Sequence, residues 1–206
     1  MKKNPSRRER EREQRINYVL NVAEKLFAEK GFVKVTMQQI AQKAEFALGT
    51  LYSFFKGKKH IYTQMIDTKL EQFVSFIEEE ISSETNPRQQ VEKFIEAKLT
   101  YLRNNLAFLQ LYFAEMHAPQ LFYGQEVGRG IKKRYDDLIA NLSNILNRGI
   151  SEGIFMPSQP EALANALDGL TNALALPWLK KVPSSSPLEE IKTVKEVFLN
   201  GTLARP

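Results

Sequence analysis

The chain of 206 residues contains no cysteine. Without thiols it can form no disulfide, carries no thiolate nucleophile and cannot build a Cys-ligated zinc site. Its two histidines, His60 and His117, are too far apart in sequence to suggest a metal-binding motif. A chain without disulfides fits a reducing compartment. We therefore expect a cytoplasmic protein with no bound metal and no cofactor.

Long apolar runs are also missing. No stretch approaches the roughly 20 apolar residues that a membrane-spanning helix needs. The first eight residues, MKKNPSRR, lead into a charged segment and not into the apolar core of a secretory signal. Alternating patterns typical of strands are scarce as well. With 43% hydrophobic residues the chain can nevertheless bury a large core, so we predict a soluble globular protein with no membrane partner.

Positive charge is concentrated near the N-terminus. Residues 1–62 carry 14 Lys and Arg against six Asp and Glu, a net charge of +8, whereas residues 63–206 carry 15 against 18, a net charge of −3. This asymmetry is typical of a chain of which only one end meets a polyanion. Nucleic acid is the first candidate for that partner, and an anionic membrane surface is the second.

Apolar residues recur at helical spacing along almost the whole chain. From Ile16 to Phe27 they follow one helical face, and the pattern stops at Gly31, which is typical of a C-cap. These patterns predict an all-α fold of about nine helices, with a three-helix N-terminal head (residues 1–60) on a larger helical bundle (residues 61–206). The expected helices span residues 8–30, 37–44, 48–55, 58–82, 87–105, 106–116, 121–152, 160–181 and 187–203.

The strongest functional signal is the segment TMQQIAQKAEFALGTLYSFF, residues 36–55. Its pattern predicts a helix, a short turn and a second short helix, an arrangement known as a helix-turn-helix. The outward side chains of the second helix and its cap are uncharged and small enough for this helix to approach base edges closely. They are Ala47, Leu48, Gly49, Thr50, Tyr52 and Ser53. Lys56, Lys58 and Lys59 follow and would attract phosphates.

This pattern resembles the DNA-binding domain of the tetracycline-repressor (TetR) family over about residues 10–62. The resemblance is carried by residues 16–27, Gly31, Phe32, residues 35–37, Ile40, Ala41, Ala44, residues 49–52 (GTLY), Phe55 and Lys58. A second similarity is the sequence GISEGIFM, residues 149–156, which is similar to the turn before the dimerisation helices of these regulators. The sequence departs from the family at Glu45, where glycine is usual, and at Leu48, where a polar residue is common.

The resemblance implies a role for individual residues of the head. Thr36 and Tyr52 would donate hydrogen bonds to phosphates, and Lys58 would bind another phosphate together with the N-terminus of its helix. Base reading would fall to three further side chains, because amide, hydroxyl and methyl groups match base edges. These are Gln38, Leu48 and Thr50.

The larger half shows no catalytic set: it has no glycine-rich phosphate loop, no nucleophile motif and no paired histidine and carboxylate. We therefore expect no enzyme. It does carry many aromatic and flexible side chains, which could line a cavity for an apolar or amphipathic small molecule. The candidate ligand-binding residues are Tyr101, Phe108, Tyr112, Phe113, Met116, His117, Phe122, Tyr123 and Trp178. A packed core explains the same residues, so both interpretations stay open.

Two apolar stripes lie near the C-terminus. The stripe residues predicted to form a dimer interface are Leu163, Leu167, Leu170, Leu174, Ile191, Val194 and Phe198. A monomer of this size would struggle to cover both stripes, so we predict an isologous four-helix interface about a twofold axis. A homodimer would place two recognition helices about one DNA turn, or a small multiple, apart, and would bind a palindromic operator.

Together these features predict a dimeric, ligand-responsive regulator of transcription, a repressor released from its operator by a small-molecule effector of unknown identity. Two alternatives remain. One is an architectural, nucleoid-organising DNA-binding protein with no effector, and the other is an effector-binding protein that has lost operator recognition.

Overall fold

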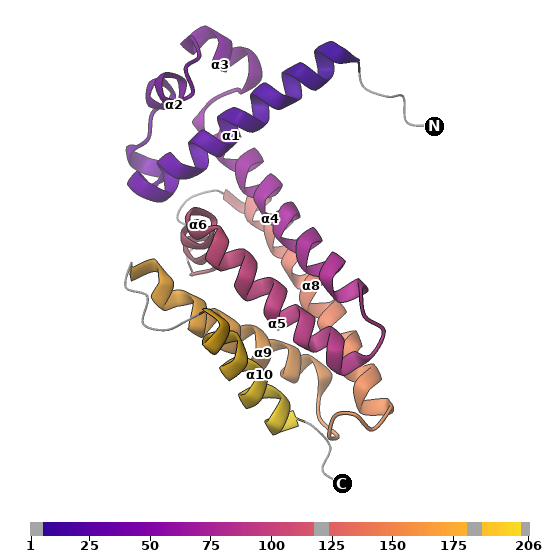
Figure 1. The fold of residues 1–206 in the computed structure, drawn as a ribbon. Helices are drawn as coiled ribbons and strands as arrows, with labels where there is room; N and C mark the ends of the chain where they lie inside the picture. Colours follow the sequence, from indigo (N-terminus) through magenta and orange to yellow (C-terminus); the bar gives the residue numbers. More distant parts are fainter. Residues whose placement is uncertain (1–5, 118–123, 181–186, 203–206) are drawn as a thin grey trace. The chain divides into compact units, whose positions relative to one another are not determined.

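The computed structural model describes residues 6–117, 124–180 and 187–202, and within these ranges it leaves out the side chains of residues 115–117, 124–132, 180 and 187. The described residues form nine α-helices and one 3-10 helix, which confirms the all-α prediction (Figure 1). The helices are α1 (Arg7–Lys34), α2 (Met37–Lys43), α3 (Leu48–Phe54), α4 (Lys58–Ser82), α5 (Pro87–Asn104), α6 (Leu106–His117), α8 (Gly124–Ser151), α9 (Pro160–Ala175), η1 (Leu176–Lys180) and α10 (Pro187–Thr202).

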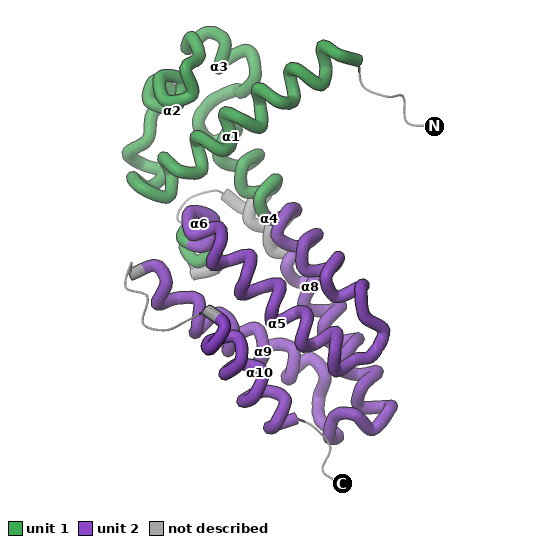
Figure 2. Tube along the Cα trace, viewed as in Figure 1, with its two compact units in different colours: residues 1–69, 110–128 green, residues 70–109, 129–206 purple. Residues whose placement is uncertain are grey.

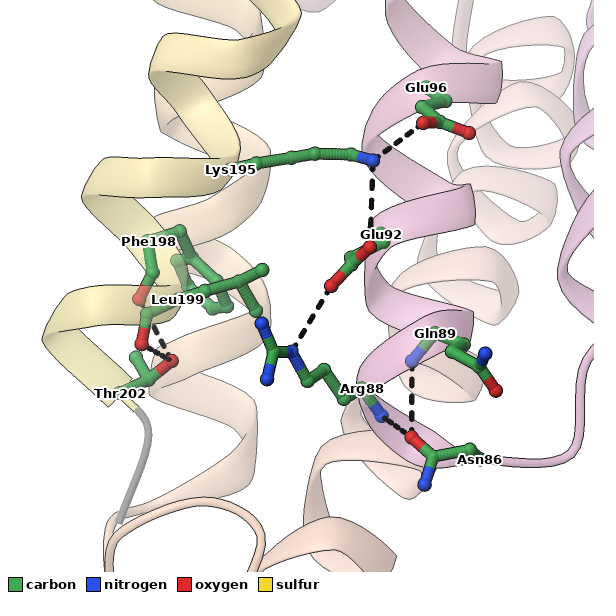
Figure 3. Close-up of polar contacts among 9 residues, drawn as sticks. All are labelled: Asn86, Arg88, Gln89, Glu92, Glu96, Lys195, Phe198, Leu199 and Thr202. Atoms are coloured by element: carbon green, nitrogen blue, oxygen red, sulfur yellow. Dashed lines mark hydrogen bonds and ion pairs between the residues drawn. The ribbon is translucent and has the colours of Figure 1, made fainter. Parts of the chain in front are cut away.

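Several helix ends lie where the sequence places them, because local side chains satisfy free backbone groups. Thr36 and Gln39 form a reciprocal capping box at the start of α2. The side chain of Asn86 accepts hydrogen bonds from the backbone N–H groups of Arg88 and Gln89 at the start of α5 (Figure 3). Gly31 breaks α1 with φ 75° and ψ 157°, and one more turn follows before Lys34.

The described chain divides into two compact units (Figure 2). Unit 1 comprises residues 1–69 and 110–128, and unit 2 comprises residues 70–109 and 129–206. Three helices, α4, α6 and α8, contribute residues to both units. The boundary expected between residues 60 and 61 concerns function, not compactness, and it stays a prediction.

Within unit 2, α5, α9 and α10 pack against one another. Ion pairs tie α10 to α5: the Lys195 ammonium lies 2.5 Å from a carboxylate oxygen of Glu96 and 3.6 Å from one of Glu92 (Figure 3). Arg88 reaches the same Glu92 at 3.1 Å. Because these pairs are partly exposed, they orient the two helices more than they stabilise them.

The segment GISEGIFM ends α8 and turns the chain back. The carbonyl of Gly149 accepts hydrogen bonds from the N–H groups of Ile154 (2.8 Å) and Phe155 (3.2 Å), and Gly153 adopts φ 72°. A Cβ atom at Gly149 would lie 2.4 Å from the buried Phe155 ring and 3.1 Å from Pro87. Position 149 therefore requires glycine because the aromatic ring packs directly on the helix backbone.

We expect Gly149→Ala to lower the free energy of unfolding by about 1–3 kcal/mol, because a methyl group there overpacks the contact with Phe155. Chemical denaturation followed by circular dichroism measures this. Gly201→Ala is the matched control, since a Cβ at that helical position meets nothing within 4 Å. An equal or smaller loss in Gly149→Ala than in the control would contradict the packing explanation.

Candidate DNA-binding head and effector region

The helix-turn-helix rests on a small apolar core in unit 1. Its buried members on α2, α3 and the adjoining turns are Val35, Met37, Ile40, Ala41, Ala44, Leu51 and Phe55. Phe46 is half-buried. The centre of its ring lies 6.4 Å from the ring centre of Tyr18 on α1 and 6.2 Å from that of Phe54 on α3. The core fixes α3 by one face and leaves its other face open.

The turn between α2 and α3 has the left-handed geometry for which glycine is usual. Glu45 is the one non-glycine residue with positive φ (60°) among the described residues. The N–H groups of Glu45 and Phe46 bond to the carbonyls of Gln42 and Ala41, which closes the turn around it. Glutamate therefore adopts the conformation at a steric cost of about 1–2 kcal/mol, so the departure from the family pattern leaves the turn intact.

The outer face of α3 is open to a partner. Tyr52 is 54% exposed, Ala47, Gly49 and Ser53 are exposed, and Leu48 and Thr50 are half-buried. No side chain caps the N-terminus of α3, because Ala47 occupies the N-cap position. The hydroxyl of Ser53 donates to the carbonyl of Thr50 at 2.7 Å. A helix with this bare, uncharged face can lie close to base edges.

Thr36 caps α2 and is exposed at the same time. Its Oγ1 accepts the N–H of Gln39 at 3.2 Å as the N-cap of α2, while the residue remains exposed. A hydroxyl that accepts one hydrogen bond can still donate its proton, so capping is compatible with a phosphate contact. Gln38, in the first turn of α2, is exposed, and its side chain makes no hydrogen bond within the described ranges.

The lysines after α3 are not equivalent. Lys56 is exposed, and its backbone N–H donates to Nδ1 of His60 at 3.1 Å. The Lys58 ammonium instead donates to the carbonyls of Phe32 (2.7 Å) and Val33 (3.2 Å) and lies 4.4 Å from the centre of the Phe32 ring. Lys58 therefore caps the end of α1, a contact that sequence reasoning missed, and keeps one donor for another partner.

The candidate ligand-binding residues of unit 2 are part of packed clusters. Tyr101 is half-buried between the rings of Phe73 (5.3 Å), Phe76 (5.5 Å) and Phe108 (5.9 Å). The indole N–H of Trp178 donates to Glu190 at 2.8 Å, and the Arg103 guanidinium lies 5.2 Å from the indole centre. These contacts support the core interpretation for the individual side chains.

Two of the remaining candidates lie in unit 1 and are described with their side chains. Tyr112 and Phe113 are buried, with ring centres 5.4 Å apart. Met116 and His117 end α6, but their side chains lie outside the described part, as do Phe122 and Tyr123 altogether. The ligand-binding assignment of all nine residues stays a prediction.

Unit 2 also holds a buried charge that the sequence did not reveal. Lys98 of α5 is fully buried, and its ammonium pairs with the carboxylate of Asp168 on α9. The hydroxyl of Tyr135 on α8 donates to the same carboxylate, and the amide of Asn172 donates to its second oxygen at 3.0 Å. Burial lowers the pKa of the Lys98 ammonium, while the nearby Asp168 charge opposes the shift.

The predicted dimer residues separate into two groups. Leu167, Val194 and Phe198 are buried within unit 2 itself, so they belong to the core of the subunit and not to its surface. The other four are half-buried: Leu163, Leu170, Leu174 and Ile191. Small exposed residues on α9 adjoin these leucines at helical spacing, namely Ala162, Ala166, Gly169 and Ala173.

No described helix has the length and apolar character needed to cross a membrane. Within the same residues, no group of three or more His, Asp or Glu side chains is arranged to hold a metal ion.

Comparison with known proteins identifies relatives of the chain. Residues 19–65 match the family described as "Bacterial regulatory proteins, tetR family". The chain is 25% identical over 169 residues to the uncharacterized HTH-type transcriptional regulator YhgD of Bacillus subtilis (strain 168), covering 82% of this chain and 86% of that protein. It is 26% identical over 135 residues to the fatty acid metabolism regulator protein of the same organism, covering 66% and 68%. These relatives are named as regulators, not enzymes.

Solved structures share the architecture. The transcriptional regulator FadR from Bacillus subtilis, in complex with stearoyl-CoA, superposes with a TM-score of 0.72 at 21% identity, covering 89% of this chain and 97% of that chain. This likeness establishes the common fold.

Proposed function

Because the chain belongs to the TetR family of bacterial regulatory proteins, we propose that it is a dimeric, ligand-responsive DNA-binding repressor that acts in the cytoplasm and has no catalytic role. The observation that carries the proposal is the open face of α3, on which Tyr52 is exposed beside small, uncharged residues. An open, uncharged helix face of this kind fits the major groove.

The DNA contacts follow from the exposed groups of the head. Thr36 and Tyr52 donate to phosphates, Lys56 and the free donor of Lys58 add charge, and Gln38, Leu48 and Thr50 meet base edges. Ala47, Gly49 and Ser53 contribute by being small, since they let the helix backbone come close. The half-buried state of Leu48 still leaves part of its side chain for a thymine methyl group.

Dimerisation uses the apolar side of α9 that the subunit leaves uncovered. Leu163, Leu170 and Leu174 are half-buried, and the adjacent small residues let a second α9 approach closely. Ile191 of α10 adds to the same kind of surface. An isologous contact of this type gives a twofold axis and hence a palindromic operator.

The effector we propose is a thioester of coenzyme A with an acyl chain. Two observations support this class: one relative is named a regulator of fatty acid metabolism, and one solved structure of the same fold holds stearoyl-CoA. An effector that binds best to the form of the dimer with low operator affinity supplies a coupling free energy of about 1–3 kcal/mol.

Selection of random duplex DNA by the purified full-length protein tests the function. We expect enrichment of one palindromic consensus, and an affinity for it that falls about 5- to 150-fold when stearoyl-CoA is added, as the coupling energy implies. Coenzyme A alone is the control. Many weak sites without a consensus would favour the architectural alternative, and no enrichment would favour a protein that has lost operator recognition.

A further inference from the structure

The first turns of α1 carry arginine on the side that is apolar further along the helix. Ile16, Val19 and Ala23 are buried and form the core-facing side of α1. At helical spacing the same side continues toward the N-terminus through Arg12 and Arg8, both exposed. The helix therefore extends beyond the core of the head. There, arginines occupy the positions that carry core-facing apolar residues further along the helix.

Arg12 is placed against the recognition helix. Its guanidinium carbon lies 5.6 Å from the centre of the Phe54 ring, at the C-terminal end of α3. Phe54 in turn contacts Phe46, and Phe46 contacts Tyr18 of α1. This aromatic row spans α1, the turn and α3, so the position of Arg12 beside α3 is fixed by packing.

The arginines on this side of α1 are not held in ion pairs by described neighbours. No ion pair is recorded for Arg8, Arg12 or Arg15 with any carboxylate in the described ranges. Glu9 lies on the same side, three residues before Arg12, and its carboxylate accepts the backbone N–H of Ser6 at 2.6 Å. Hydrogen bonds from Ser6 lower the pKa of Glu9, so its charge serves the helix N-terminus. Arg7, on the opposite side, is paired with Glu11 at 2.8 Å.

We propose that Arg8, Arg12 and Arg15 of α1 form a second phosphate-binding surface, which binds the DNA backbone beside the end of α3. This inference rests on the proposed function, because the polyanion it requires is the operator. A guanidinium stacked on an aromatic ring keeps its edge donors free for phosphate oxygens. Arg12 thus positions the head on the duplex and carries no sequence information.

The test measures the salt dependence of binding to the selected operator for wild type, Arg12→Ala and Arg7→Ala, all as full-length dimers. Because each dimer carries two copies, we expect Arg12→Ala to reduce the log–log salt slope by about 2 and to weaken binding roughly 10- to 100-fold for all duplexes alike. Arg7→Ala removes the same charge from the opposite side of the helix and should leave both quantities near those of wild type. Arg12→Lys should retain the slope while losing part of the affinity, because a lysine keeps the charge but not the planar stacking.

Equal effects of Arg12→Ala and Arg7→Ala would overturn the inference, because they would mean that only net charge matters. Unchanged binding by Arg12→Ala would overturn it as well, while tight binding by wild type would leave the proposed function standing. If wild type binds no duplex specifically, the proposed function fails and takes this inference with it. Thermal unfolding of each variant confirms that the exposed substitutions leave the fold intact.

Discussion

Asp168→Ala is expected to lower the free energy of unfolding by about 3–5 kcal/mol, because it leaves the buried Lys98 ammonium without its counter-charge. Lys98 is fully buried among α5, α8 and α9, and the Asp168 carboxylate accepts from both Lys98 and Tyr135. The substitution removes an acceptor for both donors. Urea denaturation at one fixed protein concentration measures the loss, since dimer stability depends on concentration.

The loss should shrink as the pH rises. Burial already lowers the pKa of Lys98, and removing Asp168 takes away the charge that opposes this shift. Between the folded and unfolded pKa values the unfolded chain binds more protons, so the variant gains stability as the pH rises toward about 10. Lys98→Met in the same background should remove this pH dependence and restore much of the stability.

Asp137→Ala provides the matched control for Asp168→Ala. Its partner is the exposed Lys133 on the same helix, at 3.2 Å. An exposed pair of this kind contributes at most about 1 kcal/mol. A loss at Asp168 no larger than at Asp137, or one that does not vary with pH, would show that Lys98 does not remain buried and charged.

Tyr52→Ala is expected to weaken operator binding roughly 30- to 150-fold without lowering the free energy of unfolding. The side chain is 54% exposed, so the monomer gains little from it. A hydrogen bond to a phosphate contributes about 1–1.5 kcal/mol, and the dimer loses two of them at once. Fluorescence anisotropy with a labelled operator, at one stated salt concentration, measures the change.

Two further variants show which part of Tyr52 acts. Tyr52→Phe removes the hydroxyl alone and should account for most of the loss if the phosphate contact is the cause. Tyr18→Phe removes the hydroxyl of another half-exposed tyrosine (49%) in the same unit and should bind like wild type. Full affinity in Tyr52→Phe would move the role from the hydroxyl to the ring.

The helix-turn-helix illustrates what can be predicted from local pattern. The periodicity of apolar residues and the break at Gly31 each depend on residues a few positions apart, and the structure confirms both. The open face of α3 follows from the same periodicity. Glu45 shows the limit, because its left-handed conformation (φ 60°) is imposed by the bonds that close the turn and not by its own preference.

Contacts between distant segments could not be predicted from the sequence. From the sequence, Lys58 is expected to be a free cation at the start of a helix. In the structure its ammonium caps α1 by donating to the carbonyls of Phe32 and Val33. Lys98 and Asp168 are 70 positions apart, and no sequence pattern distinguishes them from ordinary surface charges. In the structure they form a buried pair. In neither case does any local pattern indicate the partner.

The sequence by itself determined the all-α class, the position of the recognition helix and the basic character of the N-terminal head, because capping, helical periodicity and net charge are local or additive properties. Only the tertiary structure decided which apolar residues of α9 and α10 are buried in the core of the unit, as Leu167 and Val194 are, and which stay partly exposed, as Leu170 does. A stripe of leucines has the same periodicity in both roles. Whether such a stripe is buried depends on which helices pack against it, and the packing of the whole unit decides this.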